Sequence, residues 1–199
     1  MRLVDIRRGL AHRITTPFVA LLSRVGVTPN ALTFSNLALS IAAAYVIATG
    51  RFFSGGILVL VSGLFDLLDG AVARFTGKTT TFGAVLDSTV DRVNEAAVLF
   101  GIMAWYVWDP VRGSGLEVSL VFAVLIGSFL VSYIKARAEG LGLQCPVGLF
   151  TRAERVIVLT VGLLVNQVFI ALCVLTFFVF VTVVQRLVYV RKQARSGGD

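Results

Sequence analysis

The feature that most constrains this chain is its series of long apolar runs, the longest of which covers residues 156–190. As one helix rising about 1.5 Å per residue, that run would be about 52 Å long, against a membrane hydrocarbon core of about 30 Å. The polar pair Asn166-Gln167 interrupts the run and predicts a turn that divides it into two spans. Four further runs, at residues 31–48, 52–75, 81–108 and 118–134, bring the prediction to six transmembrane helices.

The composition agrees with a membrane protein and excludes a water-soluble domain. Hydrophobic residues make up 57% of the 199 residues, charged residues make up 15%, and the mean hydropathy is +0.88. Soluble domains are about 45–50% apolar and about 25% charged, and disordered chains are more polar still. The net charge of +7 is compatible with nucleic acid, but in so apolar a chain it is typical of cytoplasmic loops and anionic headgroups. We expect an all-α integral membrane protein with membrane lipids, and no nucleic acid, as partners.

The chain reads as one membrane domain over residues 1–199. Residues 1–25 alternate arginines with apolar residues at spacings of three or four, which predicts an amphipathic interfacial helix lying in the headgroup plane. Residues 26–190 form the predicted six-helix bundle, and residues 191–199 form a short tail.

The basic residues predict the orientation of the bundle. With six spans, sixteen of the eighteen basic residues lie on the side of the termini, and only Arg51 and Arg112 lie on the other. The positive-inside rule then places both termini in the cytoplasm. The polar ends of spans two, three and five lie on the same side, so we expect a wet cavity that opens to the cytoplasm.

Four of the eleven acidic residues form a pattern near that cavity. Asp66 and Asp69 are three residues apart on one predicted helix, and Asp87 and Asp91 are four apart on the next, so each pair shares a helix face. Four converging carboxylates need cations, and oxygen ligands of this kind suit Mg²⁺, Mn²⁺ or Ca²⁺. A pair of such ions could clamp a diphosphate and assist displacement at phosphorus.

Two other interpretations of the carboxylates stay open at this point. The aspartates could cap helix ends or pair with Arg74 and Arg92, or they could form the ion site of a membrane cation transporter. A transporter does not account for Gly70, Arg74 and the spacing between the two pairs, and the chain has no internal repeat or broken-helix pair.

The aspartates belong to a longer motif. The sequence Asp66-Leu-Leu-Asp69-Gly70-Ala-Val-Ala73-Arg74, eight residues, then Gly83-Ala-Val-Leu-Asp87-Ser-Thr-Val-Asp91 resembles the signature of the CDP-alcohol phosphotransferases at every fixed position and in both gaps. Members of that family are membrane enzymes that move a phosphatidyl-type group from a CDP-linked lipid onto an alcohol and release CMP. The resemblance therefore implies the same reaction here.

The resemblance also implies roles for individual residues. It assigns two divalent ions, Mg²⁺ with Mn²⁺ as an option, to the four aspartates, and makes Asp91 the general base as well. It implies a homodimer. It places a further set of residues against the CDP-lipid: Asn30, Ala31, Leu32, Thr33, Gly70, Arg74 and Thr80.

The acceptor alcohol must be inferred from other residues, because the aspartate motif is shared by all acceptors. Five basic residues lie on the cytoplasmic side of the later spans: Lys135, Arg137, Arg152, Arg155 and Arg186. Ordinary positive-inside charge explains some of them, but the cluster favours an anionic acceptor such as a sugar or polyol phosphate.

Four further segments resemble the inositol-phosphate branch of the family, which is prokaryotic. They are Ser132-Tyr-Ile-Lys135, Arg152-Ala-Glu-Arg155, Gln185-Arg186-Leu187 and the N-terminal Arg13-Ile-Thr-Thr-Pro17. That resemblance implies a prokaryotic cell membrane, inositol 1-phosphate as acceptor, and Ser132 as a further ligand of its phosphate. Glycerol 3-phosphate, also an anion, is the second candidate acceptor, and the donor is CDP-diacylglycerol or CDP-archaeol.

Overall fold

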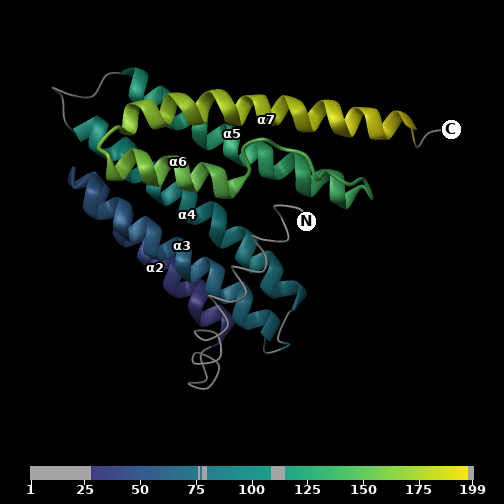
Figure 1. The fold of residues 1–199 in the computed structure, drawn as a ribbon, viewed down its shortest axis with the longest axis horizontal. Coiled ribbons are helices and arrows are strands. Elements are labelled where there is room, and N and C mark those ends of the chain that lie inside the picture. The colour runs from purple at the N-terminus through teal and green to yellow at the C-terminus, as the bar shows by residue number, and fades with distance from the viewer. Residues whose placement is uncertain (1–27, 76, 78–79, 109–114, 197–199) are drawn as a thin grey trace, which may run out of the picture.

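The computed structural model of the protein describes residues 28–75, 77, 80–108 and 115–196. Within these residues every regular element is an α-helix (Figure 1), which confirms the predicted all-α class. The helices are, in chain order, α2 (Pro29–Ala48), α3 (Phe52–Phe75), α4 (Thr81–Trp108), α5 (Gly115–Gly140), α6 (Arg152–Leu164) and α7 (Val168–Ser196). The amphipathic helix predicted at residues 1–25 lies outside the described residues.

The helices begin and end close to where the apolar runs predict. α3 and α4 have the predicted bounds, and the turn at Asn166-Gln167 separates α6 from α7, with Asn166 at a φ of 55°. Thr28 caps α2, because its side chain accepts a hydrogen bond from the backbone N–H of Ala31 at 3.3 Å. α5 extends past the predicted end at Ile134 to Gly140.

Within the described residues, four helices are long and apolar enough to cross a membrane: α2, α3, α5 and α7. The chain is therefore a multi-pass membrane protein. α4 has the length but carries Asp87, Asp91, Arg92 and Glu95 between its start and its middle, and α6 has 13 residues, which is about 20 Å of helix. The structure thus supports four of the six predicted spans by length and composition.

The six helices share one apolar core. α2 packs against α3 and α4, α5 packs along α7, and α6 contacts both α3 and α7, so it joins the two groups (Figure 1). Buried side chains from all six helices meet in this core, among them Ile47, Val59, Ile102, Val124, Leu163 and Leu172. α2 and α4 approach very closely at Gly101, where a Cβ atom would lie 2.4 Å from the carbonyl oxygen of Ala44.

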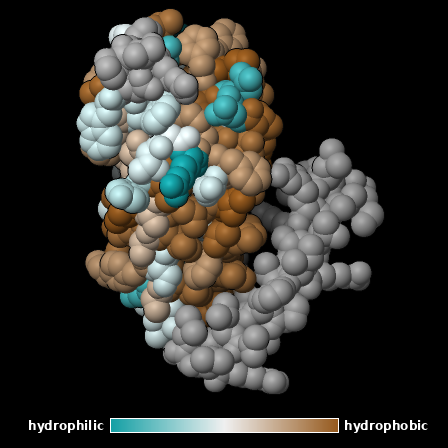
Figure 2. Space-filling model, turned by 90° about the vertical axis from the view of Figure 1, so that its left-hand side faces the viewer, coloured by the Kyte–Doolittle hydropathy of each residue, from teal (hydrophilic) through white to brown (hydrophobic). Residues whose placement is uncertain are grey.

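The outer surface of the bundle is also apolar, as lipid contact requires. Large hydrophobic side chains are exposed along every helix, and apolar residues predominate on the face drawn in Figure 2. Polar residues instead gather inside the molecule, where twelve polar or charged side chains are buried among the described residues. In a membrane protein, buried polar side chains of this kind are candidates for a functional site.

Candidate active site

The centre of the polar interior is a group of three carboxylates. One side-chain oxygen each of Asp66 and Asp69 on α3 and of Asp87 on α4 lie within 4.8 Å of one another. The loop that joins α3 to α4 is short, so the end of one helix and the start of the next bring the residues together, as the sequence predicts. An all-oxygen donor set at this separation fits a hard divalent ion.

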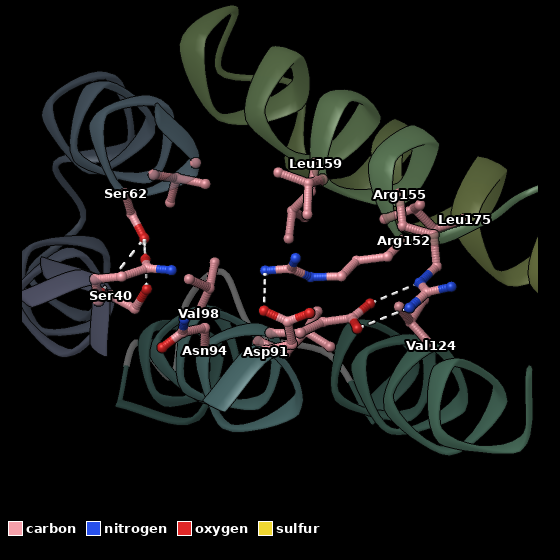
Figure 3. Close-up of a pocket in the computed structure, with 16 residues that line it drawn as sticks. Ser40, Ser62, Asp91, Asn94, Val98, Val124, Arg152, Arg155, Leu159 and Leu175 are labelled. Atoms are coloured by element: carbon pink, nitrogen blue, oxygen red, sulfur yellow. Dashed lines mark hydrogen bonds and ion pairs between the residues drawn. The ribbon is translucent and has the colours of Figure 1, made fainter. Parts of the chain in front are cut away.

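Asp91, one helical turn after Asp87, is directed to a different partner. Its Oδ1 atom lies 2.8 Å from Nη2 of Arg152, and only 8% of the residue is exposed. Arg152 also contacts Asp66, with Nη1 2.8 Å from Oδ2 and Nη2 3.1 Å from Oδ1. The guanidinium of Arg152 therefore bridges two of the predicted metal ligands from the first turn of α6. Figure 3 shows its contact with Asp91.

Helix α2 provides the other wall of the carboxylate group. The hydroxyl of Thr33 donates to Asp69 Oδ2 at 3.1 Å, and the amide of Asn36 donates to Asp66 Oδ1 at 3.4 Å. Thr33 belongs to the segment Asn30-Ala31-Leu32-Thr33 that was predicted to contact the CDP-lipid, and the structure places that segment in the first turn of α2 beside the aspartates. Asn36 was not predicted, although it lies one helical turn after Thr33 in an otherwise apolar run.

The other residues predicted to contact the CDP-lipid lie near the end of α3 and the start of α4. Gly70 directly follows Asp69, and the hydroxyl of Thr80 accepts a hydrogen bond from the backbone N–H of Gly83 at 2.9 Å, which caps α4. The side chain of Arg74 lies outside the part of the molecule that the structure describes.

A cavity of about 830 Å³ adjoins the carboxylates and contains most of the predicted acceptor residues. Its polar lining includes Ser132, Lys135, Arg152, Arg155 and Arg186. Arg137, which was grouped with them on sequence, is exposed and is not among the lining residues. Arg92 lines the cavity instead, a contribution that its position next to Asp91 could have indicated.

Two of these arginines are fixed by the fold. The guanidinium of Arg155 pairs with both carboxylate oxygens of Glu95, at 2.7 Å and 2.9 Å, and its side chain is 3% exposed (Figure 3). Arg186 on α7 donates from Nε to the carbonyl of Val147 at 2.9 Å and from Nη1 to the carbonyl of Val131. These bonds fix the guanidinium groups of both arginines at the wall of the cavity.

A second, smaller cavity of about 50 Å³ is lined in part by Asp91. Asn94 lines it and is 6% exposed, with no hydrogen-bond partner for either end of its amide. Ser62 lines the same cavity. Its hydroxyl donates a hydrogen bond to the side chain of Asn36 and lies 2.8 Å from the hydroxyl oxygen of Ser40. The polar interior therefore continues from the carboxylates into the bundle.

Comparison with known proteins agrees with this geometry. A sequence model of the CDP-alcohol phosphatidyltransferase family matches residues 26–185. The chain therefore belongs to that family, and it is a membrane enzyme.

Within the family, the most similar relatives share one kind of product. The chain is 41% identical over 197 residues to a phosphatidylinositol phosphate synthase of Mycobacteroides abscessus, covering 94% of this chain and 87% of the relative. It is 35% identical to an archaetidylinositol phosphate synthase of Pyrococcus horikoshii over 179 residues, covering 88% and 90%.

Solved structures match as well. A crystal structure of the phosphatidylinositol phosphate synthase of Mycobacterium tuberculosis with CDP-DAG bound superimposes with a TM-score of 0.82 at 38% identity, covering 89% of this chain and 94% of that one. The same enzyme in complex with manganese and citrate gives 0.81 at 36% identity, covering 88% of each chain. Divalent-metal dependence is consistent with these matches and with the carboxylate group.

Proposed function

We propose that the protein transfers the phosphatidyl group of a CDP-linked lipid to inositol 1-phosphate, releasing CMP and forming phosphatidylinositol phosphate. The observation that carries this proposal is the contact between two sites. Arg152, which pairs with Asp66 of the carboxylate group, also lines a cavity that contains Lys135 and several other arginines. A site that joins two anionic substrates needs both a cation-binding centre and fixed positive charge beside it.

Asp66, Asp69, Asp87 and Asp91 would hold two divalent ions, Mg²⁺ or Mn²⁺. When bound, such ions neutralise the diphosphate of the donor and the charge that develops on CMP. Two residues of α2 orient the carboxylates through hydrogen bonds: Thr33 orients Asp69, and Asn36 orients Asp66. In this proposal the CDP-lipid donor is contacted by Asn30, Ala31, Leu32, Thr33, Gly70, Arg74 and Thr80.

Asp91 is the proposed general base. An alcohol is a weak nucleophile, so a carboxylate must accept its proton as the oxygen attacks phosphorus. In the transfer, the hydroxyl oxygen of the acceptor forms a bond to the lipid-side phosphorus, the bond from that phosphorus to the bridging oxygen breaks, and CMP leaves with the electron pair. The ion pair between Asp91 and Arg152, a residue that lines the acceptor cavity, supports this role.

Ser132, Lys135, Arg152, Arg155 and Arg186 would bind the phosphate of the acceptor, and Arg137 would contribute from the exposed end of α5. Arg155 and Arg186 are already held by protein groups, so they present a preorganised positive wall. Glycerol 3-phosphate carries a phosphate that the same wall accepts, and it remains the alternative acceptor.

We further propose six spans in a single membrane domain, with the active site and both termini in the cytoplasm, and a homodimer as the assembly. The distribution of basic residues supports the orientation. The homodimer rests on the family resemblance alone.

CMP release by the purified protein in detergent tests the function. The assay contains CDP-diacylglycerol and Mg²⁺ with inositol 1-phosphate, glycerol 3-phosphate, serine or inositol in separate reactions. We expect release with inositol 1-phosphate, its loss on chelation of the metal, and its return with Mg²⁺ or Mn²⁺. Release with glycerol 3-phosphate alone would contradict the acceptor, and no release with any acceptor would contradict the enzyme.

A further inference from the structure

Arg152 occupies an unusual position, because it serves two groups at once. Its guanidinium donates hydrogen bonds to both oxygens of Asp66, at 2.8 Å and 3.1 Å, and forms an ion pair with Asp91, in which Nη2 lies 2.8 Å from Oδ1. The same side chain lines the large cavity that holds Arg155 and Arg186, and it is 29% exposed. Figure 3 shows it reaching from α6 toward Asp91. It thus joins both Asp66 and Asp91 to the acceptor cavity.

The bonds made by Arg152 compete with metal binding. A divalent ion coordinated by Asp66 and Asp91 needs oxygen lone pairs on the carboxylates that Arg152 now engages, and it brings positive charge to within a few ångströms of the guanidinium. Both effects oppose simultaneous occupation. An anion in the cavity gives Arg152 an alternative partner, because a guanidinium binds phosphate and carboxylate with the same paired N–H geometry.

From these contacts, and resting on the proposed function, we propose that Arg152 is a positioning residue that couples metal binding to acceptor binding. It holds Asp66 and Asp91 while the acceptor cavity is empty of anion, and it turns to the acceptor phosphate when that group arrives, which frees the carboxylates for the metal. Because such coupling is reciprocal, an anion in the cavity strengthens metal binding, and bound metal strengthens anion binding by the same factor.

Three other arginines line the cavity, and none of them pairs with both Asp66 and Asp91 among the described residues: Arg92 reaches Asp91 alone, with Nη1 3.7 Å from Oδ2. Arg155 is 3% exposed and bonded to Glu95, and Arg186 is bonded to the backbone carbonyls of Val131 and Val147. Among the described residues, neither forms a hydrogen bond or ion pair with Asp66, Asp69, Asp87 or Asp91. Arg152 also carries its charge on a long side chain at the first turn of α6, from which both partners are within reach.

The test is a titration of the full-length protein in detergent with Mn²⁺, the free ion being measured by electron paramagnetic resonance, with no CDP-lipid present. It compares the wild type with Arg152→Gln and with Arg191→Gln, which removes an equal charge from an exposed position on α7. Each protein is titrated in chloride and in sulfate at matched ionic strength. Sulfate is a tetrahedral dianion, so the result does not depend on which phosphate is the natural acceptor.

We expect Arg152→Gln to bind Mn²⁺ about tenfold more tightly than the wild type in chloride. We expect sulfate to strengthen binding several-fold in the wild type and in Arg191→Gln, and to have no such effect in Arg152→Gln. Arg152→Lys keeps a charge but lacks the planar fork that bonds two carboxylates, so its affinity should fall between the two. Monodisperse elution of each variant establishes that it is folded, and the lysine variant provides a second reading if glutamine prevents folding.

The inference is overturned if Arg152→Gln binds Mn²⁺ no more tightly than the wild type, or if sulfate strengthens binding in that variant as it does in the wild type. Failure of this inference differs from failure of the proposed function. Wild-type protein that releases CMP with inositol 1-phosphate but shows no anion effect on Mn²⁺ affinity contradicts the coupling alone. Protein that binds no Mn²⁺ under any condition contradicts the metal site as well.

Discussion

Replacement of Glu95 by glutamine perturbs the most deeply buried ion pair of the site. Glu95 holds Arg155 through two hydrogen bonds of 2.7 Å and 2.9 Å, and the exposed fractions of the two side chains are 10% and 3%. Glutamine has nearly the same shape but is neutral and offers one acceptor oxygen. The change therefore removes one charge-assisted hydrogen bond and leaves the charge of Arg155 without a counter-ion in a site from which water is largely excluded.

The expected cost follows from these contacts. Loss of one hydrogen bond between charged groups costs about 1.5–3 kcal/mol, and breaking a buried pair by removing one partner costs about 3–5 kcal/mol in all. We therefore expect a loss of about 3 kcal/mol, which at about 2–4 °C per kcal/mol for a chain of this size lowers Tm by about 6–12 °C.

The assay is thermal unfolding followed by circular dichroism in one detergent. Glu139→Gln is the matched control, because Glu139 also pairs with a cation, Lys135, but at 3.7 Å with side chains that are 55% and 50% exposed. Exposed pairs of this kind contribute about 0–1 kcal/mol. A double variant, Glu95→Gln with Arg155→Met, should recover part of the lost stability. The reasoning is refuted if Glu95→Gln lowers Tm no further than Glu139→Gln does.

Three further predictions concern catalysis and packing. Asp91→Asn should abolish CMP release while leaving CDP-lipid binding largely intact, as measured by ligand-induced thermal stabilisation; retained turnover would remove Asp91 from the role of base. Arg186→Ala should raise the apparent KM for the acceptor about tenfold or more, because it removes a fixed cation from the cavity, whereas Arg137→Ala should raise it about twofold at most, because Arg137 lies outside the lining residues; equal effects would contradict the cavity as the acceptor site. Gly101→Ala should destabilise the protein by about 1–3 kcal/mol in the same unfolding assay, because its Cβ would lie 2.4 Å from the backbone of Ala44; an unchanged Tm would show that α2 and α4 separate at no cost.

The helices could be predicted from the sequence because lipid imposes a simple requirement on composition. Each apolar run became a helix, and the bounds of α3 and α4 agree with prediction. α5 extends beyond the end of the apolar run that predicted it. Lys135 and Glu139, four residues apart, form an ion pair on its last turns, which supports the extension. Gly142, at a φ of 77°, follows the end of that helix.

Local spacing predicts which residues of the site meet only where those residues are close in sequence, whereas the acceptor residues, which are far apart in the chain, were predicted from their charge and from the family resemblance. Asp66, Asp69 and Asp87 are spaced by helical periodicity on consecutive helices, so their convergence could be inferred, whereas Asp91 lies outside that group and pairs with Arg152. The contact between Arg152 and Asp66 spans 86 residues, and that between Arg155 and Glu95 spans 60. Such contacts depend on how α6 packs against the other helices, which no local pattern specifies, and basic residues predicted only as phosphate ligands also have carboxylate partners.

The identity of the lipid product tests the central claim most directly. Purified wild-type protein is incubated with CDP-diacylglycerol, Mg²⁺ and an equimolar mixture of inositol 1-phosphate and glycerol 3-phosphate, and the lipids are extracted and analysed by mass spectrometry. We predict that phosphatidylinositol phosphate accumulates in step with CMP, and that Asp91→Asn forms none. Phosphatidylglycerol phosphate as the main product, or no new phospholipid, would contradict the account.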